Sequence, residues 1–228
     1  MNDRRLPPLF FKEYYKLSLF PNARPLKISG INAYARWTNL ICLFTAVFLY
    51  LSVSYAAADS LQAIGHLNAV MDKYNSLASN ELRFLESYET LGRKDLEKNL
   101  NDAAFVYDNA LTLLVYLQQK GQDNFRRAKI LADSFVFAAG HDRFYHDGRL
   151  RNAYSAKQLI NPETGFANLL GEWDATSRQW REDKDQVSTH TGNMAWAAIA
   201  LSRFYAERGG DAYKTTAISM GNWIRNSA

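Results

Sequence analysis

The chain has 228 residues, of which 47% are hydrophobic and 14% aromatic, so it can bury a core and does not belong to the disordered class. Its formal net charge of +4 is concentrated at the start, because residues 1–37 hold seven lysines and arginines against two acidic residues. The remainder is close to neutral and carries no basic stripe, so nucleic acid is not an expected partner.

The first 58 residues predict a leader. Residues 1–39 form a basic arm that contains prolines, and residues 40–58 are 19 uncharged residues followed at once by Asp59. This pattern is typical of a secretory signal peptide or of a membrane anchor, since about 20 apolar residues span a bilayer. A buried soluble helix is the remaining alternative. The basic arm places the body outside the cytoplasm, in the periplasm or secreted, or anchored in the inner membrane through residues 40–58 if they are uncleaved.

The one cysteine, Cys42, lies inside that apolar run, so the body 59–228 can form neither a disulfide framework nor a cysteine metal site. Apolar residues at spacings of three and four predict a helix over Ala63–Leu91. The next helices are expected at Phe105–Lys120 and Asn124–Ala139. Gly121 separates these two, which indicates an α/α hairpin with a short turn.

A long polar segment follows the first hairpin. His141–Gly148 is a polar, aromatic loop, and Leu150–Leu159 is either a short helix or irregular. Phe166–Asp185 reads as a long loop, a kind of segment that usually carries function. Ser188–Glu207 and Asp211–Arg225 predict a second hairpin, separated by a glycine pair. Helix pairs that repeat in this way stack on one another, because a single pair cannot bury its apolar faces.

Four segments in order resemble the six-hairpin glycosidase-like proteins: Tyr107–Leu111, Arg126–Ala128, Asp147–Tyr154 and Ser188–Trp196. The resemblance covers about residues 100–226. It implies an (α/α)6 toroid in which the polar N-terminal ends of the inner helices open onto a central cleft that binds carbohydrate. The body is too short for six hairpins, so the expected fold class is all-α, a partial or open toroid. Such a fold exposes an apolar flank.

Carboxylates are the candidate catalytic groups, since a glycoside hydrolase needs two of them, about 5–5.5 Å apart for retention or about 6.5–9.5 Å for inversion. Asp108 lies among apolar residues, where an acid is costly unless it is paired or faces a cleft. The alternative is a first-turn acid favoured by the helix dipole. Glu172 and Asp174 flank Trp173, and an acid beside an indole suits a sugar. The alternative is an ordinary surface loop anchored by that tryptophan.

Further candidates would bind the substrate. Arg149, Arg151 and Asn152 could clamp an acidic sugar, because guanidinium groups match carboxylates, or could brace the loop through salt bridges. His190 is either a hydrogen-bonding or acid–base group of the cleft or a structural tie between hairpins. Trp173 is a further candidate, because aromatic faces stack on sugar rings. The resemblance adds four residues at the helix starts: Tyr107, Asn109, Asn193 and Trp196.

Several kinds of site are not expected. His141 and His146 stand in a loop without the spacing of a helical zinc site, so we predict no metal. The sequence contains no phosphate-binding loop, dinucleotide glycine motif or serine nucleophile elbow, and we expect no cofactor. The sequence therefore predicts an extracytoplasmic carbohydrate-active protein, either a glycoside hydrolase-like protein that uses a carboxylate pair or a non-catalytic helical-repeat module that binds a glycan or a protein.

Overall fold

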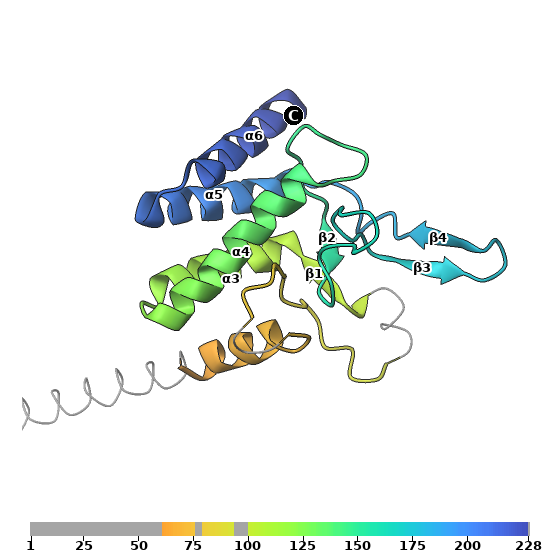
Figure 1. Ribbon diagram of the computed structural model, residues 1–228, viewed down its shortest axis with the longest axis horizontal. Coiled ribbons are helices and arrows are strands. Elements are labelled where there is room, and N and C mark those ends of the chain that lie inside the picture. Colours follow the sequence, from red (N-terminus) through yellow and green to blue (C-terminus); the bar gives the residue numbers. More distant parts are fainter. Residues whose placement is uncertain (1–60, 76–78, 94–99, 228) are drawn as a thin grey trace, which may run out of the picture. The chain divides into compact units, whose positions relative to one another are not determined.

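Two antiparallel helix pairs dominate the structure (Figure 1). The computed structural model describes residues 61–75, 79–93 and 100–227, within the unit Ala58–Ala228. The predicted arm 1–39 and leader 40–58 lie outside these residues. No helix in the described part of the chain has the length and apolar character needed to cross a membrane.

The first pair consists of α3 (Val106–Gln118) and α4 (Gln122–Gly140), and the second of α5 (Thr191–Arg208) and α6 (Asp211–Ser227). The sequence predicted all four within a few residues. Gly209 is the C-cap of α5 with a φ of 73°, in the region that favours glycine. Gly121, predicted to end the first helix, instead precedes α4 as its N-cap with a φ of 131°, while α3 ends earlier with Gln119 as its C-cap. The helices α3 and α5 pack directly against each other, and their N-terminal ends lie on the same side (Figure 1).

The chain is predominantly helical, but it also contains two small antiparallel sheets. One pairs β1 (Ala103–Phe105) with β2 (Ala153–Ser155), and the other pairs β3 (Gly171–Asp174) with β4 (Gln179–Glu182). The all-α prediction was therefore right only for the main body. A strand replaces the short helix considered within Leu150–Leu159, and the expected long loop Phe166–Asp185 contains the β3–β4 hairpin, which projects from the helices (Figure 1).

The predicted helix Ala63–Leu91 is wrong in its second half. The chain is helical over residues 61–71, but residues 79–90 have no regular secondary structure. Tertiary contacts hold this stretch extended: the Ser87 N–H donates to the Ala103 carbonyl at 2.8 Å, and Asn109 bonds both the N–H and the carbonyl of Leu85. The backbone thus finds its partners outside a helix, and Phe84 enters the core.

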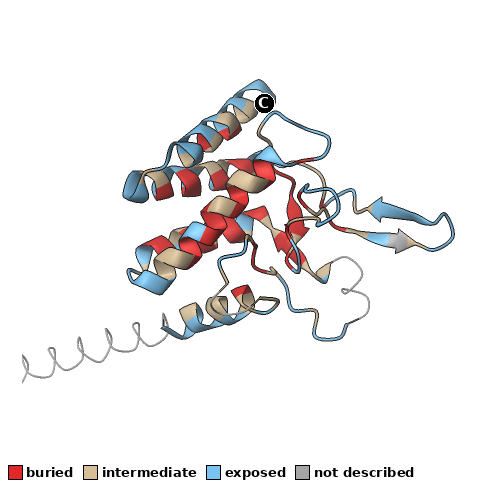
Figure 2. Ribbon diagram, in the orientation of Figure 1, coloured by how far each residue is buried: buried red, intermediate tan, exposed pale blue. Residues whose placement is uncertain are grey.

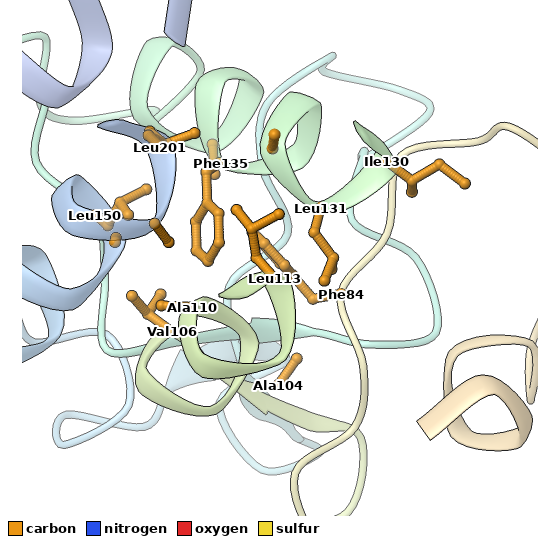
Figure 3. Close-up of a cluster of buried hydrophobic side chains, with 14 of the residues drawn as sticks. Phe84, Ala104, Val106, Ala110, Leu113, Ile130, Leu131, Phe135, Leu150 and Leu201 are labelled. Atoms are coloured by element: carbon orange, nitrogen blue, oxygen red, sulfur yellow. The ribbon is translucent and has the colours of Figure 1, made fainter. Parts of the chain in front are cut away.

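The core lies where α3, α4 and α5 meet the extended segment and the loop before β2 (Figure 3). Phe135 of α4 is fully buried and its ring centroid lies 4.9 Å from that of Phe84. Leu113 of α3 and Leu201 of α5 are equally inaccessible. Buried residues line the facing sides of α3, α4 and α5, whereas only Ala217 and Met220 of α6 are buried (Figure 2).

Two isoleucines of the second hairpin are exposed. Ile199 of α5 is 51% exposed and Ile218 of α6 is 53% exposed. Two hairpins do not make a ring, so the toroid arrangement stays a prediction.

Candidate functional site

The N-terminal ends of α3 and α5 are joined through Asn152. Its carbonyl accepts a hydrogen bond from the first N–H of α3, that of Val106, at 2.9 Å. Its side chain donates to the Asp185 carbonyl at 3.1 Å and accepts from the Asn193 amide of α5. One loop residue therefore satisfies a helix-end donor that no side chain caps, and it fixes the two inner helices side by side.

Two of the predicted aromatic residues meet at this end. The rings of Tyr107 and Trp196 contact edge to face with centroids 6.0 Å apart, and the two side chains are 40% and 37% exposed. Asp108 follows in the first turn of α3 and is half-buried. Its carboxylate forms no hydrogen bond or ion pair with any residue that the structure describes. This arrangement fits both readings of Asp108, a group at an open cleft and an acid favoured by the helix dipole.

Asn109 has a structural position. It is 1% exposed, and its amide bonds the Leu85 N–H, the Leu85 carbonyl and the Phe105 carbonyl at 2.7, 3.0 and 2.9 Å. These bonds tie the extended segment 79–90 to α3. A side chain occupied in this way has little capacity left for a ligand.

The two candidate arginines brace the loop between the hairpins. Arg151 is buried and forms an ion pair with Asp142, and it also donates to the Val187 carbonyl at 2.6 Å. Burial raises the pKa of Asp142, but hydrogen bonds from Arg151 and from two backbone N–H groups outweigh it, so the pKa lies below the usual value. Arg149 pairs with Asp147 at 2.6 Å on the surface and covers the Tyr145 ring.

Two of the histidines contact near neighbours in the chain. The ring of His190, which precedes α5, is hydrogen-bonded to the Ser188 hydroxyl at 2.7 Å. His141 stacks on Phe137 with centroids 4.1 Å apart. Among the described residues, no group of three or more histidine, cysteine or acidic side chains could hold a metal ion.

The β3–β4 hairpin carries the other predicted acids. Asp174 accepts hydrogen bonds from the Thr176 N–H at 2.9 Å and the Ser177 hydroxyl at 2.8 Å, and its pair with Arg181 measures 3.1 Å. The hydrogen bond from Ser177, followed by those from the backbone, lowers the pKa of Asp174. Asp174 thus organises the turn between the strands.

Glu172 is exposed and stands opposite Arg181, while the backbone of Trp173 pairs with that of Trp180. Glu172 and Arg181 line a cavity of about 620 Å³ on one side of the hairpin. Asp108 lines neither this cavity nor its neighbour described below. The structure therefore gathers most of the predicted residues into two groups, one at the helix ends and one on the hairpin, while Arg149 and Arg151 brace the loop between the helix pairs.

A polar groove at the base of the hairpin was not predicted from the sequence. This hairpin groove has a volume of about 660 Å³ and lies between the hairpin, the loop before β1 and the segment after β2. Its lining combines two exposed aromatic rings, Phe166 and Trp180, with the carboxylates of Asp102 and Glu182. Amides also contribute to the walls: Asn101, Gln158, Asn161 and Asn168.

The backbone of Gly171 allows Trp180 to form a wall of the groove. A Cβ at position 171 would lie 2.2 Å from the Arg181 carbonyl oxygen and 2.8 Å from the Trp180 indole nitrogen. The indole thus rests against bare backbone across the hairpin, an approach that only glycine permits.

Asp102 is the perturbed acid of the groove. Burial raises its pKa above the usual value, although hydrogen bonds from the Ser155 hydroxyl and the Lys157 N–H oppose the shift. Glu86 accepts the Asp102 N–H at 3.1 Å and adds a nearby negative charge. Glu182 is paired with Arg143. The groove therefore holds one carboxyl group shifted toward its neutral form and one that is ion-paired.

The sequence carried few signals for this groove. Asp102 has a φ of 66°, in the left-handed region. The dipeptide Asn101-Asp102 before an apolar run is a weak signal for such a turn, because Asn and Asp adopt this conformation more readily than most residues. Phe166, Trp180 and Glu182 became partners of Asp102 only through the pairing of β1 with β2 and of β3 with β4.

Comparisons with protein-family models, with curated proteins and with solved structures found no significant match to this chain.

Proposed function

We propose that the protein is an extracytoplasmic carbohydrate-binding protein that holds a glycan in the hairpin groove. One observation carries the proposal: two accessible aromatic rings, several amides and two carboxylates line the same cavity. Aromatic faces cover the apolar faces of sugar rings, while amide and carboxylate oxygens accept hydrogen bonds from hydroxyl groups. Ligand sites commonly combine apolar walls with a few polar groups in this way.

The helical body supports this proposal as a scaffold. Parallel inner helices with adjacent N-terminal ends, each followed by an outer helix, are what an open (α/α) toroid of the six-hairpin glycosidase-like type requires. The uncharged run 40–58 would export the chain or anchor it in the membrane, so that the groove meets glycans outside the cytoplasm.

A glycan array probed with the full chain tests the proposal, because the identity of the sugar need not be known in advance. We expect Trp180→Ala to abolish binding to every glycan that the native chain retains, since the indole forms a wall of the groove. The matched control is Trp196→Ala, which removes an indole of comparable exposure at the helix ends. Retained binding by Trp180→Ala would contradict the proposal.

A second candidate is a glycoside hydrolase, and the raised pKa of Asp102 favours it. A raised pKa shifts a carboxyl group toward the protonated form that can donate to a leaving group, and Glu182 supplies another carboxylate in the same groove. Reducing-end release from the glycans that bind is the assay. Asp102→Asn should abolish release if this candidate holds. If Asp108→Asn abolished release and Asp102→Asn did not, the catalytic site would lie at the N-terminal ends of the inner helices.

A further inference from the structure

Another cavity lies at the end of the helices that carries the α3–α4 and α5–α6 turns, opposite the N-terminal ends of α3 and α5. This turn pocket has a volume of about 1040 Å³ and is formed by the start of α4, the end of α5 and the start of α6. The 18 residues of α5 span about 27 Å, so the turn pocket is well separated from the N-terminal ends of the inner helices.

The apolar part of the turn pocket is preformed. Ile130 and Phe204 are each 3% exposed, and they belong to the main core. The Phe204 ring contacts Tyr213 edge to face with centroids 4.7 Å apart, and Phe125 is half-buried on α4. These side chains are held by the packing of two hairpins, so a ligand need not order them.

The acidic side chains of the turn pocket are already neutralised. Asp133 pairs with Lys129 at 2.5 Å and accepts a hydrogen bond from the Tyr213 hydroxyl. Asp123 pairs with Arg126 at 2.8 Å. With these carboxylates paired, the pocket does not repel an anion.

One cationic side chain of the turn pocket has no carboxylate partner among the described residues. The Arg208 guanidinium lies 3.5 Å from the centre of the Phe125 ring and is exposed. No carboxylate among residues 61–75, 79–93 and 100–227 pairs with it. Stacking on the ring holds the guanidinium plane while leaving its N–H groups available at the edge, as in the binding of carboxylates by stacked arginines.

We propose that the turn pocket binds a small amphiphilic anion, a flat apolar body that carries one carboxylate. The body would lie against Ile130, Phe204 and Tyr213, and the carboxylate would accept two hydrogen bonds from Arg208. Such a ligand differs from a neutral glycan in both charge and polarity. The turn pocket shares no lining residue with the hairpin groove, so this proposal does not depend on the function proposed for that groove.

Isothermal titration of the full chain with two probes of the same shape tests this proposal. The probes are 1-naphthoate, which is an anion, and 1-naphthamide, which is neutral. We expect naphthoate to bind at one site and more tightly than naphthamide. Arg208→Gln should weaken naphthoate roughly tenfold, the size expected when a hydrogen bond to a charged group is lost, and leave naphthamide within about twofold.

The matched control is Arg203→Gln on the same helix, where the guanidinium pairs with Glu207 at 2.6 Å and lies outside the pocket. This variant should bind both probes like the native chain. A third variant, Phe125→Leu, should weaken both probes, and circular dichroism should show the native helix content. Absence of naphthoate binding, or equal weakening by Arg203→Gln and Arg208→Gln, would overturn the proposal.

Discussion

Replacing Asp142 with asparagine should destabilise the protein strongly. The side chain of Asp142 is 0% exposed and that of Arg151 is 7% exposed, so the ion pair is shielded from water. Asp142 also accepts the N–H groups of Phe144 and Tyr145 at 2.8 and 3.0 Å. An asparagine leaves the Arg151 charge buried without its counterion, although the Val187 carbonyl and the Tyr145 ring still contact the guanidinium.

Breaking a buried pair by removing one partner costs about 3–5 kcal/mol. For a chain of this size the loss corresponds to a fall in Tm of roughly 10 °C. Urea denaturation and thermal unfolding, both followed by circular dichroism, measure it.

The matched control is Asp147→Asn in the same loop, which breaks an exposed pair with Arg149. Asp147 is 42% exposed, so this variant should lose at most about 1 kcal/mol. If Asp142→Asn cost no more than Asp147→Asn, the reasoning that the buried pair braces the loop would be refuted.

The remaining predictions concern pH, the hairpin and the core. The lowered pKa of Asp142 stabilises the fold above the ordinary aspartate value of about 3.9, and this contribution is lost as the pH falls through the lower folded value. The pKa of Asp102 is raised above the ordinary aspartate value of about 3.9, so the free energy of unfolding increases as the pH falls through the folded pKa. Asp102→Asn should remove this increase, as measured by urea denaturation at several pH values. Gly171→Ala should displace the Trp180 indole and shift its fluorescence, whereas an unchanged spectrum would contradict the close approach. Phe135→Ala should cost about 3–5 kcal/mol in urea denaturation, because its ring is fully buried; a loss below about 1 kcal/mol would contradict that position.

The hairpins could be predicted from the sequence because their signals are local. The apolar spacing of Phe105–Lys120 determines the face of α3 that is buried, and Gly121 lies in the turn between α3 and α4. The same holds for Ser188–Glu207 and the glycine pair that follows. Sequence periodicity was misleading over residues 79–90, because the bonds between Asn109 and Leu85 come from a residue far along the chain and override helix propensity.

The candidate site could be predicted only in part. The sequence marked the polar starts of two helices, and the structure brings Tyr107 and Trp196 together there. It also marked acids beside Trp173, but the hairpin pairing that places Trp180 and Glu182 in one groove with Asp102 is a tertiary property. The alternative reading of Arg151 as a brace fits its burial with Asp142.

Glycan binding by the full chain and by Trp180→Ala decides whether the hairpin groove is the binding site. We expect the native chain to retain one class of glycan on an array, Trp180→Ala to lose it, and Trp196→Ala to keep it. Loss with Trp196→Ala together with retention by Trp180→Ala would contradict the account and move the binding site from the hairpin groove to the N-terminal ends of α3 and α5.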